Sequence, residues 1–425
     1  MAARLASVPA FFALRILSGL LLLKLSASFL PVVGFGDFSQ FMLFAALLNI
    51  VAIGGAQNGL VRQAAAAEDD TALSRVHGAA LLIWGIATPL LALVAAIASG
   101  IIARILVGTA EPRWAVIALA LVALAAGPGQ IWCSILSGRK RVIVSLSAQA
   151  TGLAVGTALA AWLIIAGEPL AATIGFAAGS LVTMAVAFPF VVRLGIRTVP
   201  LVVARAEVPR LLAYSAAFAA TTVFSSVLLF ALRSHYRAHF GAIALGYWLM
   251  ANRISDISTQ LLGLCLIQVF VPHFAMLRDE PERRALVLRS WALGVAVMGA
   301  IPLVFAVLAR PLVHIFLSDA YLPAIPAIRT YMIGDLLRVW ASLAMFTAFA
   351  RGHPVRYAAI EMGTLSMMAL IALPLITAGD LRAPWLGYAS AYAVTALIST
   401  ALFVFNGRRW RAGPAMPLAG PRSAS

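Results

Sequence analysis

The feature that most constrains this chain is its series of long apolar stretches. Twelve segments of 20 or more mostly apolar residues follow one another within 425 residues, starting near Val8, Ser39, Gly78, Trp114, Val142, Ala171, Leu211, Ala242, Ser290, Ala324, Tyr357 and Trp385. About 20 apolar residues suffice for a helix to cross the hydrocarbon core of a bilayer. Because backbone groups in lipid must be hydrogen-bonded within the protein, such segments fold as helices. The sequence therefore predicts an all-α membrane protein with twelve transmembrane helices.

The basic residues are distributed unevenly between the two sides of the predicted membrane. Of 31 Lys and Arg residues, 20 lie in segments on the side of the N-terminus, six lie in the opposite loops and five lie within spans. An excess of Lys and Arg marks cytoplasmic loops. We therefore expect a multi-pass membrane protein with both termini in the cytoplasm. This topology accounts for most of the net charge of +16, which argues against nucleic-acid binding.

The least hydrophobic internal stretch divides the predicted helices six and six. We expect an N-terminal six-helix bundle over 1–197, a cytoplasmic basic linker over 198–210 and a C-terminal six-helix bundle over 211–407. The tail over 408–425 is rich in Pro, Gly and Arg and is expected to be disordered in the cytoplasm. Two equal halves related by a pseudo-two-fold axis are typical of transporters with a central site.

Charged and amide side chains within the spans indicate the candidate site. A charge at the centre of a lipid-facing helix costs roughly 2.5–3.5 kcal/mol, so these groups should face protein or a water-filled interior. One stripe, on the eighth predicted helix, recurs every four residues and consists of Trp248, Asn252, Asp256 and Gln260. A second stripe, on the tenth, consists of Tyr331, Asp335, Arg338 and Ser342. We expect Arg253 to pair with Asp256, and these helices to surround a hydrated central cavity together with Asn49.

Basic residues outnumber acidic residues inside the spans. The five bases are Arg15, Lys24, Arg253, Arg329 and Arg338, and the three acids are Asp256, Asp335 and Glu361. This surplus favours an anionic substrate. The alternative is that Arg253–Asp256 and Asp335–Arg338 are structural ion pairs that hold helices together. That alternative does not explain Arg15 and Lys24, because the first predicted helix carries no acid.

Residues for several other kinds of chemistry are missing or misplaced. The two lysines, Lys24 and Lys140, do not follow a Walker A glycine, which excludes an ATPase. His235 and His239 have the spacing of metal ligands but lie in a short loop without a Glu between them, so we interpret them as surface residues. We predict no catalytic residue, no metal site and no cofactor.

Three stretches resemble a known family. The stretch "GGAQNGLVRQAAAAEDDTALSRVHG" (54–78) resembles the end of the second helix of Wzx-type flippases. These are bacterial polysaccharide flippases of the MOP superfamily, which also includes MATE exporters and lipid II flippases. "GYW…ISD…Q" (246–260) and "GDLLRV" (334–339) resemble the branch that flips the lipid-linked unit of enterobacterial common antigen. Further positions that fit this branch are Lys24, Gln40, Asn58, Gly59 and Arg62.

The resemblance implies two six-helix bundles with alternating access around a cationic cavity. It implies a flippase, not an enzyme, that carries an undecaprenyl-pyrophosphate-linked oligosaccharide to the periplasmic leaflet for O-antigen or related lipopolysaccharide biosynthesis. The candidate substrate-binding residues are Arg15, Lys24, Asn49, Arg62, Asn252, Arg253, Gln260 and Arg338. The candidate ion-coupling residues are Asp256, Asp335 and Glu361. Candidate partners are membrane lipids and the polymerase and chain-length proteins of the same pathway.

Two other functions compete with this interpretation. A MATE-like exporter of organic cations, or another small-molecule carrier, should have an acid-rich site, whereas here bases outnumber acids. A membrane enzyme of the same pathway should carry a large outer loop with reactive side chains. The longest predicted outer connection, 310–323, is short and largely apolar.

Overall fold

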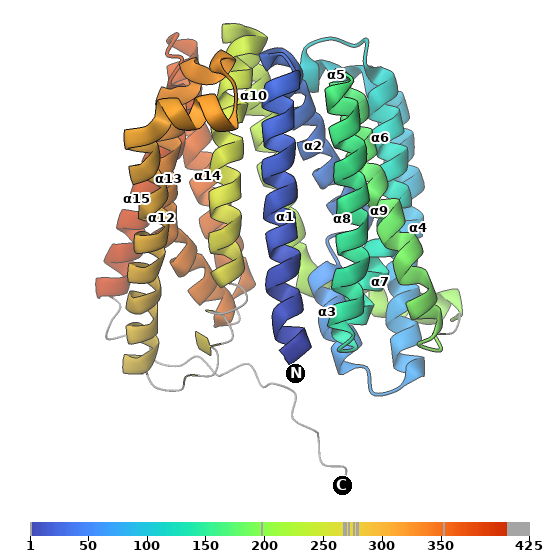
Figure 1. Ribbon diagram of the computed structural model, residues 1–425. Coiled ribbons are helices and arrows are strands. Elements are labelled where there is room, and N and C mark those ends of the chain that lie inside the picture. The colour runs from blue at the N-terminus through green and yellow to red at the C-terminus, as the bar shows by residue number, and fades with distance from the viewer. Residues whose placement is uncertain are drawn as a thin grey trace. The chain divides into compact units, whose positions relative to one another are not determined.

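The computed structural model describes residues 2–196, 199–266, 270, 273–274, 277, 280–351 and 353–405, and every regular element over these ranges is a helix (Figure 1). Eight helical segments there are long and apolar enough to cross a membrane: Ala10–Phe29, Val32–Ala52, Asp70–Ile97, Arg113–Gly138, Val142–Ile165, Pro169–Val192, Val355–Thr377 and Ala383–Phe403. The prediction of an all-α membrane protein is confirmed. The predicted tail over 408–425 lies outside the described residues.

The chain forms two compact units. The first comprises Met1–Leu249 with Phe316–Tyr321, and the second comprises Met250–Ile315 with Leu322–Ser425. The division falls inside one helix, α10 (Leu201–Cys265), whose first part packs into the core of the first unit through Leu211 and Phe230. The division into six-helix bundles over 1–197 and 211–407, with a linker over 198–210, remains a prediction.

Among the residues that the structure describes, the first unit contains nine helices before α10. They are α1 (Ala2–Phe29), α2 (Val32–Ala52), α3 (Gln57–Ala66), α4 (Asp70–Ile97), α5 (Ser99–Val107), α6 (Arg113–Ala125), α7 (Gly127–Gly138), α8 (Val142–Ile165) and α9 (Pro169–Val192). The side chain of Asp69 accepts a hydrogen bond from the backbone N–H of Ala72, which caps α4. The helix α2 begins at Val32, directly after Pro31 and before the predicted start near Ser39, and it includes Asp37, whose carboxylate pairs with an arginine described below.

Glycines bring α8 and α9 into close contact along their length (Figure 1). Each helix carries a GxxxG pattern, with Gly152 and Gly156 on α8 and Gly175 and Gly179 on α9. A Cβ atom added to Gly179 would lie 2.8 Å from the Cα atom of Gly156. Small residues at such spacing let helix backbones approach in membranes, where apolar surface alone gives little driving force. This helix pair is therefore specified by residue size.

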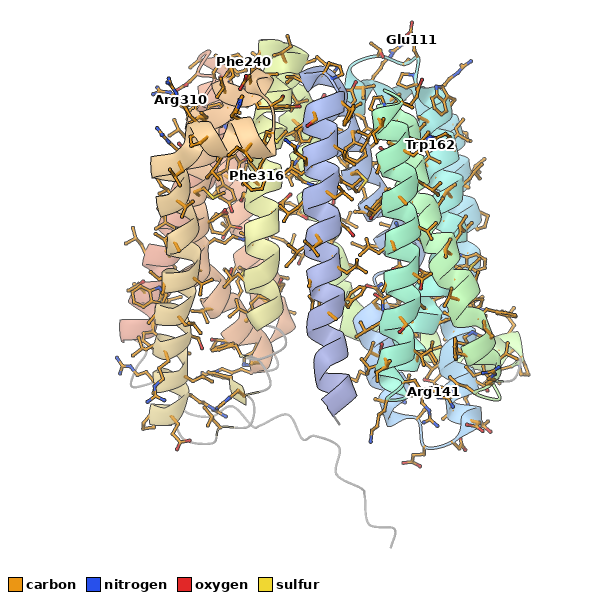
Figure 2. All side chains as sticks on the ribbon, in the orientation of Figure 1. Glu111, Arg141, Trp162, Phe240, Arg310 and Phe316 are labelled. Carbon is orange, nitrogen blue, oxygen red and sulfur yellow. The ribbon has the colours of Figure 1, made fainter. Side chains whose placement is uncertain are left out.

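The connections of the first unit alternate between its two ends. Figure 2 shows Glu111, between α5 and α6, at one end and Arg141, between α7 and α8, at the other. The predicted topology requires this alternation, because it places Arg113 and Arg141 on opposite sides of the membrane. Which end faces the cytoplasm remains a prediction.

The second unit contains the last part of α10 and four long helices. Besides α12 (Glu280–Phe316), they are α13 (Ile325–Ala350), α14 (Pro354–Thr377) and α15 (Ala383–Phe405), and the short 3-10 helix η2 (Asp319–Ala324) precedes α13. The backbone breaks within α10 at Gly241, whose φ of 83° favours glycine, so α10 consists of two helical segments. The helices α13, α14 and α15 pack against one another. They position the polar cluster described next.

Candidate functional site

Asp335 is the centre of a buried polar cluster in the second unit. This residue of α13 is 1% exposed. Its Oδ1 atom accepts two hydrogen bonds of 2.7 Å, one from the hydroxyl of Ser255 on α10 and one from the hydroxyl of Tyr388 on α15. Its Oδ2 atom is buried without a hydrogen-bond partner among the described residues. A buried polar atom normally has a partner, so this oxygen is a candidate position for a proton or a cation.

Arg338 lies one helical turn after Asp335 and extends the cluster. Its Nη1 atom donates a hydrogen bond of 3.3 Å to the Tyr388 hydroxyl, and its guanidinium lies 5.3 Å from the centre of the Tyr392 ring. Glu361 on α14 interacts electrostatically with Arg338, and the hydroxyl of Tyr357 is hydrogen-bonded to Glu361. The Tyr388 hydroxyl thus connects the carboxylate of Asp335 to the guanidinium of Arg338. A hydroxyl that both donates and accepts can transmit a change of charge from one partner to the other.

The stripe on α10 is arranged differently from the prediction. Asn252 donates a hydrogen bond of 3.3 Å to the carboxylate of Asp256, and no ion pair between Asp256 and Arg253 is observed among the described side chains. Asn252 lies one full turn before Asp256, where side chains on a helix meet most directly. Arg253 is half-buried. The side chain of Gln260, which was also predicted to bind substrate, lies outside the described residues.

Amide side chains form a chain within the first unit. The Gln57 amide donates to the Gln130 amide oxygen at 2.6 Å, and the Gln130 amide donates to that of Asn49 at 3.1 Å. These residues belong to α3, α7 and α2, so the chain crosses three helices. The sequence indicated Asn49 but not its two partners. Their signal was weak, because no second charged or amide residue lies one helical turn from Gln57 or Gln130 to mark a polar face with it.

A second group of polar contacts in the first unit ties α2 to α10. The carboxylate of Asp37 and the guanidinium of Arg237 form an ion pair at 3.0 Å. One turn away, Arg233 is buried and donates a hydrogen bond of 3.0 Å to the side-chain oxygen of Gln40. The Arg233 guanidinium also lies 5.8 Å from the centre of the Trp248 ring. The short loop predicted around His235 and His239 would include Arg233 and Arg237, whereas the structure places all four residues in α10.

The predicted site residues are divided between the two units. Arg15 and Arg62 are exposed on α1 and α3, and Lys24 donates a hydrogen bond of 3.3 Å to the backbone oxygen of Leu317. With Asn49, these residues belong to the first unit. Asn252, Arg253, Asp256, Asp335, Arg338 and Glu361 belong to the second unit. Within the described ranges, no group of three or more His, Cys, Asp or Glu residues has the arrangement of a metal site.

Two residues of the Asp335 cluster, Ser255 and Tyr388, were missed by the sequence analysis as site residues. Ser255 is adjacent to the predicted stripe and is 1% exposed. Tyr388 and Tyr392 are four residues apart within an apolar span, so they share a face of α15. That spacing was the available signal. It indicates a polar face but not which helix it contacts.

The comparison with protein families shows the family to which the chain belongs. Residues 27–326 match the model of a family described as "Polysaccharide biosynthesis protein". The chain belongs to this family. No curated protein is similar enough in sequence to match the chain.

Solved structures show the fold of this polysaccharide biosynthesis protein. A multidrug resistance MATE family transporter of the MOP superfamily, in an inward-facing conformation, is 15% identical, with 92% of this chain and 95% of that chain covered and a TM-score of 0.76. The lipid II flippase MurJ is 13% identical, with 94% and 87% covered and a TM-score of 0.70. A MOP superfamily transporter from Pyrococcus furiosus, described as having a binding pocket of reverse polarity, is 16% identical, with 95% and 94% covered and a TM-score of 0.64. The chain therefore has the MOP fold.

Proposed function

We propose that this polysaccharide biosynthesis protein is a flippase for an undecaprenyl-pyrophosphate-linked oligosaccharide. It would move the lipid-linked unit from the cytoplasmic to the periplasmic leaflet of the bacterial inner membrane, for O-antigen or a related surface polysaccharide. The observation that carries the proposal is the family match over residues 27–326. The MOP fold supports it, because both transporters and a lipid II flippase have that fold.

The phosphate end of the substrate suits the cations of the two units. Arg15 and Lys24 in the first unit and the half-buried Arg253 in the second are basic residues of the predicted spans. An arginine binds phosphate oxygens with two parallel hydrogen bonds, and Arg253 is the residue to which we assign this contact. Arg338 is a weaker candidate, because Tyr388 and Glu361 already surround its guanidinium.

The sugar end of the substrate suits the amide chain of the first unit. Amide groups both donate and accept hydrogen bonds, which is what sugar hydroxyls require. We assign Asn49, with Gln130 and Gln57, to sugar contacts. Arg62 in the first unit and Asn252 in the second are further candidate substrate contacts.

The membrane potential provides enough energy for this transport. A lipid pyrophosphate carries roughly two negative charges, and moving each across about 100 mV releases about 2.3 kcal/mol, which gives roughly 4–5 kcal/mol for the outward step. No nucleotide is needed for that step. Returning the empty carrier is the role that we assign to Asp335, Asp256 and Glu361, through uptake of a proton or a cation at the unpartnered Oδ2 atom of Asp335.

The test is a flipping assay with the purified full chain in liposomes. A polyprenyl-pyrophosphate oligosaccharide is added to one leaflet, and its appearance in the other leaflet is measured with a membrane-impermeant glycosidase. We expect flipping that requires the protein and rises with an imposed potential. The matched cell experiment deletes the gene and measures whether the lipid-linked unit accumulates on the cytoplasmic face. Flipping at the protein-free rate would refute the proposal.

One observation favours a second function, a MATE-like exporter of organic cations. Asp335 accepts a hydrogen bond from Tyr388, whose ring centre lies 4.6 Å from that of Tyr331 and 4.8 Å from that of Tyr392, and aromatic rings near a carboxylate suit a cation. Uptake of a fluorescent organic cation into the same liposomes distinguishes the two functions. Cation uptake without lipid flipping would establish the exporter. An enzyme of the same pathway is less well supported, because the similar solved structures described above are transporters and a flippase.

The proposed orientation places both termini in the cytoplasm. It follows from the excess of basic residues in alternate connections. Reporter fusions that are active on one side of the membrane, placed after Arg141 and after Glu111, test it. The Arg141 fusion should report the cytoplasm and the Glu111 fusion the periplasm. The polymerase and chain-length proteins of the pathway are proposed partners that co-purification would detect.

A further inference from the structure

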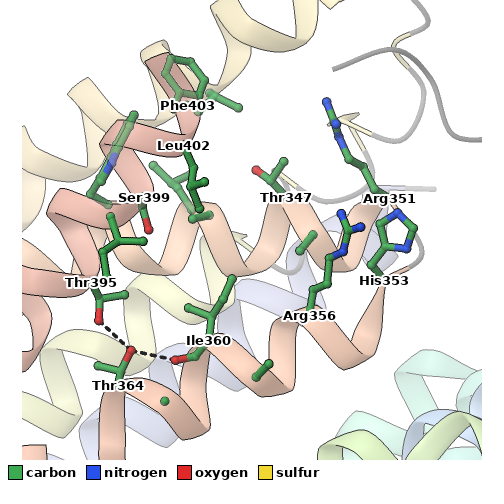
Figure 3. A pocket seen from close by; sticks show the side chains of 18 of the residues that line it. Thr347, Arg351, His353, Arg356, Ile360, Thr364, Thr395, Ser399, Leu402 and Phe403 are labelled. Atoms are coloured by element: carbon green, nitrogen blue, oxygen red, sulfur yellow. Dashed lines mark hydrogen bonds between the residues drawn. The ribbon is translucent and has the colours of Figure 1, made fainter. Parts of the chain in front are cut away.

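The second unit contains a pocket that the proposed transport site does not use. It has a volume of about 700 Å³ and is lined by residues of α12, α13, α14 and α15. All lining residues belong to the second unit. Figure 3 shows Arg351, His353 and Arg356 grouped at one end and the hydroxyls of Thr364 and Thr395 at the other. The two ends of the pocket therefore differ in chemistry.

The first end is basic. Arg351 follows the last residue of α13, His353 precedes α14, and Arg356 lies in the first turn of α14. The guanidinium of Arg351 lies 5.7 Å from the centre of the Phe274 ring, and that of Arg284 lies 5.3 Å from the ring of Phe403, which lines the pocket. No acidic residue is among the described residues that line it. This end suits an anion.

The body of the pocket is apolar. Its walls include Ile360, Met367, Ile398, Leu402 and Phe403.

The hydroxyls at the far end already have partners within the protein. The Thr364 and Thr395 hydroxyl oxygens lie 2.9 Å apart, and each hydroxyl is also within hydrogen-bond distance of a backbone oxygen, that of Ile360 for Thr364 and that of Ala391 for Thr395. A hydrocarbon chain that contacts them leaves no polar group of the protein newly unpaired. The pocket thus suits a ligand with an anionic head and an apolar tail.

We propose that this pocket binds an anionic phospholipid of the bilayer. The phosphate would lie between Arg351 and Arg356, and one acyl chain would fill the space along Ile398 and Leu402. Basic pockets at helix ends on the cytoplasmic side bind anionic lipid headgroups, and anionic lipids are concentrated in that leaflet. A free anion would leave the apolar walls uncovered, and an organic cation would meet three basic side chains. The proposal does not depend on the identity of the transported substrate.

The test uses two kinds of variant of the full chain. Arg351→Gln with Arg356→Gln removes the charges. Gly363→Leu fills the pocket, because Gly363 lines it and a Cβ atom added there meets nothing within 4 Å. The control is Arg310→Gln with Arg382→Gln, which removes two exposed arginines that do not line the pocket. Thermal unfolding of each variant confirms that it is folded before binding is measured.

Binding of phosphatidylglycerol and phosphatidylcholine to the purified protein is measured by native mass spectrometry. We expect phosphatidylglycerol to bind at least tenfold more tightly. The double arginine variant should lose about 30-fold in affinity, as expected for removing two cationic contacts to the headgroup. Gly363→Leu should weaken both lipids, and the control should behave as the wild type.

Two results would overturn the proposal. One is that the two lipids bind with equal affinity, or that the folded pocket variants bind phosphatidylglycerol as tightly as the wild type does. The other is that a polyprenyl pyrophosphate displaces phosphatidylglycerol, binds more tightly than it does, and loses affinity in the pocket variants. That result would make the pocket part of the transport site. If the protein does not flip the lipid-linked oligosaccharide but still binds phosphatidylglycerol more tightly than phosphatidylcholine, the proposed function is refuted and the lipid pocket is not.

Discussion

The substitution Tyr388→Phe removes one hydroxyl and two hydrogen bonds to charged groups. The hydroxyl donates to Asp335 at 2.7 Å and accepts from Arg338 at 3.3 Å. Hydrogen bonds to charged groups contribute about 1.5–3 kcal/mol each, whereas those between helices in membranes average about 0.6 kcal/mol. We take about 1–2 kcal/mol for each bond. Tyr388→Phe should then lower the free energy of unfolding by about 2–4 kcal/mol, and Ser255→Ala, which removes one bond, by about 1–2 kcal/mol.

The structure provides a matched control for this substitution. Tyr321 is also fully buried, and its hydroxyl has no hydrogen-bond partner among the described residues. Tyr321→Phe removes the same atom without a bond, so it should leave stability unchanged or raise it slightly. Thermal unfolding in detergent is measured for Tyr388→Phe, Ser255→Ala, Tyr321→Phe and the first two combined. If Tyr388→Phe unfolds at the temperature of Tyr321→Phe, the Asp335 cluster does not hold these helices together.

Three further predictions concern charge and packing. Arg253→Ala should abolish flipping, whereas Arg253→Lys should retain part of it, because lysine keeps the charge but lacks the planar guanidinium group. Full flipping by a correctly inserted Arg253→Ala variant would show that Arg253 does not bind the phosphate. Asp37→Asn breaks a partly buried ion pair and should lower the free energy of unfolding by about 1–2 kcal/mol. A variant in which Asp37 and Arg237 are exchanged should regain that stability. An exchange variant as unstable as Asp37→Asn would contradict this prediction. Gly179→Ala should lower the free energy of unfolding by about 1–3 kcal/mol, because the added Cβ atom crowds the α8–α9 contact. Gly19→Ala is the control, because a Cβ atom added there meets nothing within 4 Å. Equal unfolding temperatures for the two variants would refute packing by residue size.

The helices could be predicted from the sequence because their hydrogen bonds are local. A long apolar stretch in lipid satisfies its backbone within itself, whatever lies beside it. The break between α6 and α7 at Ala126 was not predicted, although Pro128 follows it directly. The segment Arg113–Gly138 is mostly apolar, with a mean hydropathy of 1.9, so hydropathy alone predicts a single span. Local signals thus gave the fold class but not every boundary.

The candidate site could be predicted only in part, because its contacts are between helices. The spacing of Asp335 and Arg338 indicated a polar face, and the structure confirms that both contact one residue. That residue, Tyr388, lies on another helix, and nothing in the order of residues shows which helices pack together. The expected pairing of Arg253 with Asp256 relied on a distance of three residues along one helix. Asn252, a full turn from Asp256, makes the contact that is observed.

Two helices of the second unit connect the Asp335 cluster to the proposed lipid pocket. α13 carries Asp335 and is followed directly by Arg351, so about 24 Å of helix joins the cluster to the rim of the pocket. α14 carries Arg356 in its first turn and Glu361 about 7.5 Å further along, where it interacts with Arg338.

Any movement that separates α13 from α14 would therefore weaken the Arg338–Glu361 interaction and also change the width of the pocket. If such a movement accompanies ion uptake at Asp335, lipid and ion binding must be linked, and the linkage must be reciprocal. Asp335→Asn imitates the protonated carboxyl, so it should change the affinity for phosphatidylglycerol by the same factor by which the bound lipid changes the proton affinity of Asp335. An unchanged lipid affinity in a folded Asp335→Asn variant, together with a lipid-dependent proton affinity in the wild type, would show that Asp335 is not the group through which α13 and α14 link the two sites.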